Sequence, residues 1–132
     1  IQGKVEIGNY VRMHSNVHIG QLSIIKDYVW IFPYVVLTND MYPPMDKLKG
    51  CTIDEYAIVT TGSILLPGKN VGANTLVAAG SVVSKDVPEY AIVRGVPAHI
   101  TGDVRDIRDD EDSQVYPWKT YLKEYRGYPW QK

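Results

Sequence analysis

Large aliphatic residues recur at every sixth position over most of this chain, and this period constrains the fold more than any other feature. The column runs unbroken from Ile1 to Leu37 and starts again from Ile53 to Val83. Its members are Ile1, Ile7, Met13, Ile19, Ile25, Ile31, Leu37, Ile53, Val59, Leu65, Val71, Val77 and Val83. A six-residue period matches neither the 3.6-residue turn of an α-helix nor the two-residue alternation of a plain strand.

The period fits a short strand followed by a corner, repeated so that three sides close a triangular coil. A second column, four positions after the first, is small or aliphatic except at Lys69, which gives two inward positions per hexad. Three hexads therefore make one coil. Stacked coils place equivalent residues about 4.8 Å apart, the spacing of hydrogen-bonded strands. We predict an all-β, parallel β-helix over residues 1–102; the alternative is β-sandwich strands with accidental spacing.

Composition excludes several classes of protein. The 132 residues carry 14 Lys and Arg against 15 Asp and Glu, a formal net charge of −1, so we expect neither a nucleic-acid nor a membrane partner. No apolar run approaches the roughly 20 residues that cross a bilayer. The single cysteine, Cys51, excludes an internal disulfide and favours a cytoplasmic protein. Ile1 already lies inside the repeat, so we expect a fragment of a longer chain.

The repeat is interrupted once, by residues 38–52. The step from Leu37 to Ile53 is one hexad plus ten further positions. A long irregular loop inside a compact solenoid is typically functional; the alternative is an Asn/Asp turn capped by two prolines. Gln21 precedes Asn39 by three hexads, so we expect it directly beneath Asn39, one coil down.

A second feature is a stack of small residues at another corner. Thr61-Gly62 and Ala79-Gly80 are separated by three hexads, which is one full coil. Small outward side chains leave a groove in which a long thin ligand can lie against exposed backbone N–H and C=O groups. The alternative is that small residues here only allow tight corners.

The repeat and two of its motifs resemble the hexapeptide-repeat acyltransferases, whose fold is a left-handed parallel β-helix. The loop opens with Thr-Asn-Asp-x-Tyr-Pro at residues 38–43, similar to a motif of members that acetylate amino sugars carried on nucleotides. Other members have a His-Pro pair near Met41-Tyr42-Pro43. The segment Gly95-Val96-Pro97-Ala98 is similar to the family's exit signature, Gly-Asn-Pro-Ala followed by Lys or Arg, although Val96 and His99 depart from it.

The resemblance implies an acyltransferase that moves acetyl from acetyl-CoA to the amine of a nucleotide-linked amino sugar, with no metal. It also implies that coenzyme A runs along the small-residue wall between neighbouring subunits. Because the loop and the small-residue stack fall on different corners, we expect a C3 homotrimer with its sites at the interfaces.

Site residues follow from this hypothesis. Asn39 would orient the amine, and Asp40 or His18 would accept its proton. The expected substrate contacts are Gln21, Tyr42 and His14. The expected contacts of the coenzyme are Thr61, Gly62, Ala79 and Gly80, with N–H donors for the oxyanion at the glycine corner and with Lys85 and Arg94 near its phosphates. His99 is a weaker candidate for catalysis.

Three other functions remain open on the sequence. O-acetylation of a sugar or polysaccharide normally needs a base such as histidine. Gly50-Cys51-Thr52-Ile53 is similar to part of the β-helical carbonic anhydrases, but three zinc-binding histidines cannot be assembled with their spacing. A non-catalytic interaction module would need only the repeat.

Residues 103–132 form a tail of different composition. Its first part, residues 103–112, is rich in charge and is expected to be solvated. Trp118, Tyr121, Leu122 and Tyr125 then fall at i, i+3, i+4 and i+7 after Pro117, which predicts a short helix. We expect its aromatic face to cover the last coil's open strand edge or a neighbouring subunit.

Overall fold

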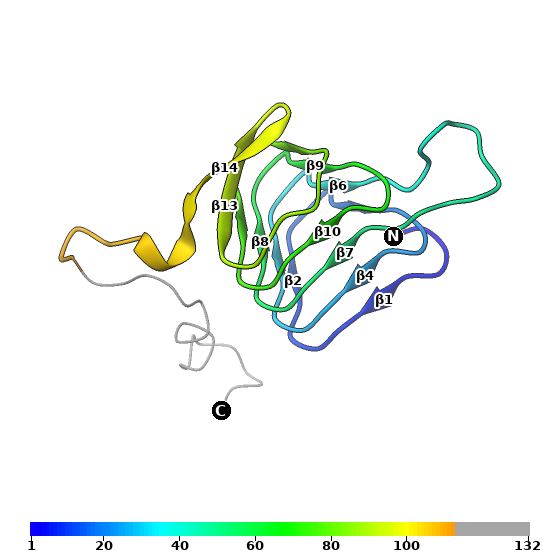
Figure 1. Cartoon of the computed structure of the whole chain (residues 1–132). Helices are drawn as coiled ribbons and strands as arrows, with labels where there is room; N and C mark the ends of the chain where they lie inside the picture. Colours follow the sequence, from blue (N-terminus) through cyan, green and yellow to red (C-terminus); the bar gives the residue numbers. More distant parts are fainter. Residues whose placement is uncertain (113–132) are drawn as a thin grey trace.

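The computed structural model describes residues 1–112, and the helix expected near residues 118–125 lies outside them. The described chain winds into a triangular β-solenoid of about five turns (Figure 1). Its strands are β1 (Glu6–Ile7), β2 (Arg12–Met13), β3 (His18–Ile19), β4 (Ile24–Ile25), β5 (Trp30–Ile31), β6 (Val36–Leu37), β7 (Thr52–Ile53), β8 (Ile58–Val59), β9 (Ile64–Leu65), β10 (Asn70–Val71), β11 (Leu76–Val77), β12 (Val82–Val83), β13 (Ala91–Gly95) and β14 (Ala98–Asp103), followed by the 3-10 helix η1 (Val104–Asp106).

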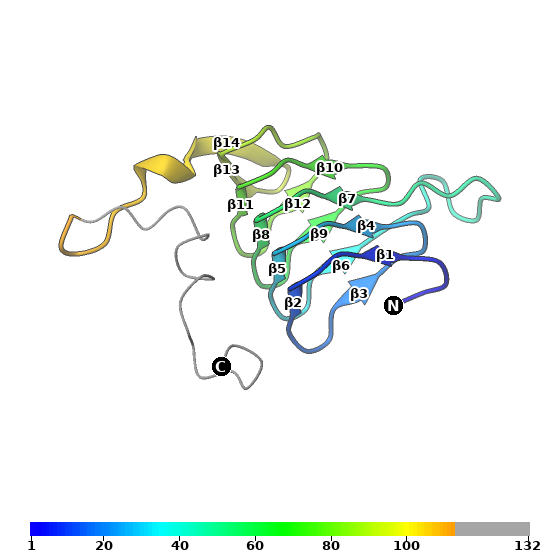
Figure 2. The ribbon, with the colours of Figure 1, turned by 90° about the horizontal axis from the view of Figure 1, so that it is seen from below.

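Three sheets form the sides of the prism. Sheet A has the order β1-β4-β7-β10, sheet B the order β14-β13-β11-β8-β5-β2, and sheet C the order β12-β9-β6-β3. Neighbouring coils pair in parallel with the predicted register, so that Ile19 faces Leu37 and Leu37 faces Leu65. Figure 2 shows the strands of successive coils stacked in this way.

The two inward columns build the core. From Ile19 onward every member of the first column is buried, and Ile19, Leu37 and Val77 have no exposed surface. Ser23 and Thr75, in the second column, are also buried, and each hydroxyl donates to a carbonyl three positions earlier. Ile7 is 43% exposed because it belongs to the outermost coil of the described chain, which has no coil beneath it. The six-residue period of the sequence therefore corresponds to the positions whose side chains are buried.

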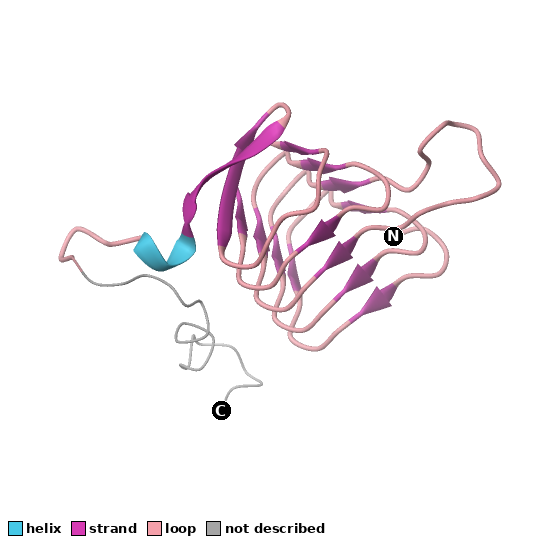
Figure 3. Cartoon of the chain, viewed as in Figure 1, coloured by secondary structure: helices cyan, strands magenta, loops and turns pink. Residues whose placement is uncertain are grey.

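The end of the solenoid departs from the pure repeat. β13 pairs in parallel with β11, and β14 then turns back antiparallel to β13 through Val96-Pro97. The sequence analysis treated this segment only as an exit signature and did not predict the hairpin. η1 follows, and Val104 is fully buried. Figure 3 shows strands and corners almost throughout; no helix among residues 1–112 is long and apolar enough to cross a membrane.

Three corners separate the sheets, and we name each by its content. The loop corner joins sheet C to sheet A and holds residues 20–22, 38–52, 66–68 and 84–86. The small-residue corner joins sheet B to sheet C and holds residues 14–16, 32–34, 60–62 and 78–80. The third corner joins sheet A to sheet B and carries Tyr10, Tyr28 and Tyr56, whose rings stack with centroids 5.0 and 4.8 Å apart.

Candidate functional site

Asn39 stands where the chain leaves the solenoid and enters the loop. Its side-chain Nδ2 donates to the carbonyl of Gln21 at 3.1 Å, which confirms that Gln21 lies one coil beneath it. Its own carbonyl accepts from the Lys49 amide at 2.8 Å, so the two ends of the loop are tied together. A Cβ at Gly20 would lie 3.2 Å from Asn39 Cγ, so the glycine lets this side chain pack against the coil below. Asn39 is therefore held in one position.

Asp40 follows at the base of the loop, and only one of its two carboxylate oxygens accepts a hydrogen bond. Its Oδ2 accepts from the Met45 amide at 3.2 Å. Its Oδ1 is shielded from solvent and has no hydrogen-bond partner among residues 1–112. A shielded carboxylate oxygen without a donor is uncommon in folded proteins, and it is suited to accept a proton or an N–H from a bound ligand.

Tyr42 lies farther out along the loop. Its side chain is 72% exposed, and Figures 1 and 2 show the loop projecting away from the prism. Within one chain this position leaves Tyr42 in solvent, so contact with a substrate would need a second surface facing the loop.

The two histidines predicted near the loop lie on different surfaces. His18 is exposed on the outer side of β3, in sheet C, between the loop corner and the small-residue corner. His14 lies at the small-residue corner, where its Nε2 accepts from Trp30 Nε1 at 2.9 Å. Its ring stacks against Phe32 with centroids 5.0 Å apart. The structure therefore places His14 across sheet C from the loop.

The predicted small-residue stack exists and is open to solvent. The Gly80 amide donates to the Thr61 carbonyl, and the Gly62 amide to the Pro33 carbonyl, at 2.9 and 3.0 Å. A Cβ at Gly62 or Gly80 would have no neighbour within 4 Å. Both glycines have positive φ, +72° and +70°, but Asn16 and Tyr34 adopt this conformation at the same corner. A positive φ alone thus does not require glycine at this corner position. Because residues 62 and 80 are glycines, the two upper coils carry no side chain at that position.

Two of the N–H groups at the glycine corner are already in use, because Gly62 and Gly80 donate to the coil beneath. The amides of Thr61 and Ala79, beside them on the exposed surface, donate to no backbone carbonyl within the described part of the chain. These two amides are the N–H groups that the corner can offer to a ligand.

The two cations expected near phosphates lie on different elements of the fold. Arg94 is on β13, where its Nε donates to Thr101 Oγ1 at 3.1 Å. The next residue, Gly95, donates its amide to Ser81 Oγ, which places this hairpin directly above the Ala79-Gly80 corner. Lys85 instead belongs to the loop corner. Only Arg94 continues the small-residue stack.

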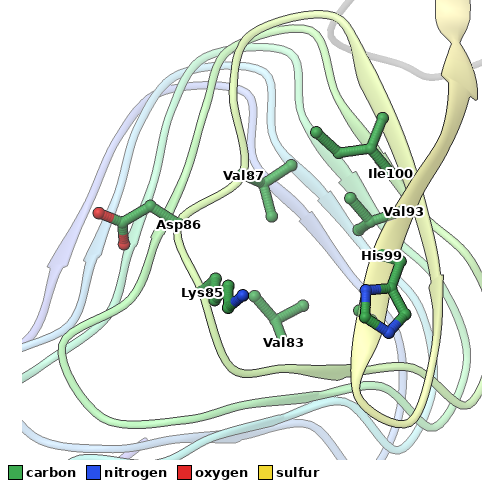
Figure 4. Close-up of a pocket in the computed structure, with 8 residues that line it drawn as sticks. Val83, Lys85, Asp86, Val87, Val93, His99 and Ile100 are labelled. Atoms are coloured by element: carbon green, nitrogen blue, oxygen red, sulfur yellow. The ribbon is translucent and has the colours of Figure 1, made fainter.

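Lys85 and His99 both line a hollow at the C-terminal end of the prism. Its volume is about 350 Å³, and Figure 4 shows Val83, Val87 and Val93 beside its centre. The full lining is Val83, Lys85, Asp86, Val87, Val93, Ala98, His99 and Ile100. His99, on β14, therefore belongs to the end of the solenoid.

Cys51 closes the loop and is chemically inert. It is fully buried, with Sγ 3.3 Å from the Thr38 carbonyl and 3.2 Å from the Leu66 carbonyl. Burial raises the pKa of this thiol to about 11, so it stays protonated near neutral pH. Within residues 1–112 no three His, Cys, Asp or Glu side chains gather in a way that could hold a metal ion.

Known proteins resemble this chain in both sequence and fold. Galactoside O-acetyltransferase of Escherichia coli K12 is 28% identical over 144 residues, covering 92% of this chain and 66% of that protein. A 2,3,4,5-tetrahydropyridine-2,6-dicarboxylate N-acetyltransferase of Staphylococcus aureus JH9 is 30% identical over 80 residues, covering 61% of this chain and 33% of that protein. No protein-family model matches.

Among solved structures, the serine acetyltransferase of Brucella abortus S19 in complex with coenzyme A superimposes with a TM-score of 0.70 at 28% identity, over 75% of this chain and 40% of that one. A second serine acetyltransferase in complex with CoA gives 0.66 at 28%, over 74% and 39%. These relatives are hexapeptide-repeat acetyltransferases, and the β-solenoid of this chain matches the fold of that family. The predicted resemblance and the predicted fold class, a left-handed β-helix, are thus confirmed. The chain spans between one third and about two thirds of these relatives' lengths.

Sequence reasoning missed the aromatic partners of His14. Phe32 follows His14 by one full coil, as Trp30 follows Arg12, so the coil register already stacks these pairs. The same arithmetic that placed Gln21 under Asn39 would have found them.

Proposed function

We propose that this chain is an acetyltransferase of the hexapeptide-repeat family and transfers acetyl from acetyl-CoA to the amine of a nucleotide-linked amino sugar. The observation that carries the proposal is the base of the loop, where a fixed Asn39 stands beside Asp40 with its shielded, unpartnered carboxylate oxygen. Support for the coenzyme comes from the solved relatives that hold coenzyme A. The acetyltransferases among the relatives support the reaction type.

The reaction joins the amine to the acetyl carbon and releases the coenzyme thiolate. The neutral amine attacks the thioester carbonyl, a C–N bond forms, and the tetrahedral oxyanion collapses as the C–S bond breaks. Asn39 orients the amine, with Gln21 and Tyr42 beside the acceptor, and Asp40 or His18 accepts the proton that the nitrogen loses. The leaving thiolate can also take that proton. Thr61 and Ala79 amides donate to the oxyanion.

The coenzyme lies along the small-residue corner in this proposal. Its pantetheine arm follows Thr61-Gly62 and Ala79-Gly80, where added side chains would find open space. Its phosphates meet Arg94 on the hairpin above. Lys85 lies at the loop corner and lines the hollow at the C-terminal end of the prism, beside His99 of the same hairpin.

A homotrimer brings the two corners together. The half-buried outer residues of sheets B and C include Leu76, Val36, Ile64 and Val82, beside Arg12 and His18, whereas sheet A presents Glu6, Ile24, Thr52 and Asn70. The apolar sheets flank the small-residue corner, so burying them against neighbours places that corner at an interface. The projecting loop of one subunit then meets the small-residue corner of the next.

A turnover assay that detects released thiol tests the reaction. We expect release of coenzyme A with amino sugars and none with their hydroxyl counterparts. Asn39→Ala should lower kcat more than His18→Ala; an equal or greater loss in His18→Ala contradicts the division of roles. Release only with the hydroxyl sugars contradicts the amine acceptor.

O-acetylation is the second candidate, favoured by the resemblance to galactoside O-acetyltransferase. A hydroxyl needs a stronger general base than an amine does. The exposed His18 would serve as that base, because His14 Nε2 is occupied by the Trp30 indole N–H. Under this mechanism His18→Ala would abolish thiol release with hydroxyl sugars.

A further inference from the structure

A cluster of rings stands at the lower end of the small-residue corner. The Trp30 and Phe32 centroids are 5.1 Å apart, and both rings lie nearly parallel to the imidazole of His14, at 7° and 27°. The Arg12 guanidinium lies over the Trp30 ring, 4.3 Å from its centroid. We call Arg12, His14, Trp30 and Phe32 the ring platform.

The coil register explains why the platform ends where the open stack begins. Phe32 occupies the coil above His14, and in the next two coils the equivalent positions hold Thr60 and Ala78. The Thr60 hydroxyl turns inward and donates to the Val77 carbonyl. Large rings on the first two coils therefore give way to short side chains above, along one continuous corner.

The hydrogen bond from Trp30 fixes the state of His14. Because Nε2 accepts the indole N–H at 2.9 Å, the ring N–H that remains for a ligand is that of Nδ1. His14 is exposed, so this Nδ1–H can donate to a ligand. The platform thus offers apolar ring faces and one directed N–H donor.

We propose that the ring platform binds the sugar ring of the acceptor, an inference that rests on the proposed function. Arg94 at the upper end of the corner sets the coenzyme's phosphates there, so its thioester end points down toward the platform. The C–H face of a pyranose packs on the side of Phe32 that is turned away from His14, by dispersion and burial. His14 Nδ1 donates to a ring substituent, and the amine is left facing the thioester.

Binding of the sugar ring can be measured separately from acetyl transfer by comparing an acceptor amine that carries a sugar ring with one that does not. Phe32→Leu keeps an apolar side chain but removes the flat face. We expect its KM for the amino sugar to rise about tenfold or more, with KM for 2-aminoethanol and the Kd for acetyl-CoA unchanged. Tyr28→Leu, which removes a stacked ring from a different corner, is the matched control and should change none of these values.

Calorimetric titration with the amino sugar alone separates the two proposals. Weaker binding to Phe32→Leu than to the unmodified protein supports the platform even where no acetyl transfer occurs, which would defeat only the proposed function. Equal sugar binding by both proteins, or equal losses with the sugar and with 2-aminoethanol, overturns the platform.

Discussion

The loop corner and the small-residue corner are built from the same hexad, yet they differ in what they offer. At the loop corner ten extra residues leave the register, and they bring Asp40 with an unused carboxylate oxygen. At the small-residue corner nothing is inserted, and Gly62 and Gly80 leave the surface bare. The comparison teaches that a solenoid gains chemistry by adding chain at one corner and gains a binding wall by removing side chains at another.

Excising the loop should have the largest effect. Removing residues 40–49 restores the six-residue spacing from Leu37 to Ile53, and Gly50 already lies over the Leu22 backbone one coil below. We expect kcat to fall at least about 100-fold, since the Asp40 carboxylate and the Tyr42 contact to the acceptor are lost. Circular dichroism and thermal melting should show an intact solenoid. Activity retained by this variant would break the assignment of chemistry to the loop corner.

Filling the bare wall should have the next largest effect. Gly80→Asn keeps a residue type that tolerates positive φ, as Asn16 does at the equivalent position, and adds a side chain to the stack. KM for acetyl-CoA should rise about tenfold or more, equivalent to at least about 1.4 kcal/mol.

The matched control for the bare wall is Gly68→Asn at the loop corner. Gly68 also has positive φ, at +73°, so the backbone strain is comparable. Its KM for acetyl-CoA should stay within about twofold, in the range of a peripheral change. Equal effects at both corners would mean that the strain, and not the filled groove, weakens binding.

Mixing two impaired variants tests whether the corners meet between subunits. Asp40→Asn impairs the loop and Gly80→Asn impairs the wall. At acetyl-CoA concentrations far below the raised KM of Gly80→Asn, a site regains the unmodified rate only with one intact half from each copy. Random mixing in a trimer should restore about a quarter of the sites. After co-refolding, thiol release should return to about that fraction. No recovery from mixed trimers would place both halves in one chain.

The smallest effect is expected at Cys51. Its thiol pKa is raised to about 11 by burial, so the folded protein should not react with iodoacetamide at pH 8. Because the folded thiol holds its proton more tightly than the unfolded one, its contribution to the free energy of unfolding should be fully present below the unfolded pKa near 9 and should be lost as the pH rises through 11. Pulse labelling with mass detection checks the first statement and denaturant melts check the second.

The repeat made most of the fold predictable. Each hexad repeats the same pattern of buried and exposed positions, so counting along the sequence was enough to place Ile19, Leu37 and Leu65 in one column of one sheet. The register also predicted Gln21 beneath Asn39. The β13–β14 hairpin could not be predicted in this way, because it lies beyond the last regular hexad and depends on pairing between Ala91–Gly95 and Ala98–Asp103.

The candidate site was less predictable than the fold. Lys85 and Arg94 read alike as cations in the sequence, yet one lies at the loop corner and the other above the bare wall. His14 read as a neighbour of the loop, but its hydrogen bond to Trp30 holds it at another corner. The register stacks Trp30 on Arg12, but the hydrogen bond from Trp30 to His14 joins two neighbouring columns, so counting hexads along one column does not predict it.

The hydrogen bond from the Lys49 amide to the Asn39 carbonyl seals the loop at its neck. Because the coil resumes at Gly50 over Leu22, the packing of the solenoid does not depend on the number of residues in the loop beyond that hydrogen bond. Loops of other lengths and sequences should therefore be interchangeable at this position. The solenoid could then acquire specificity for a new acceptor without changes in its three sheets.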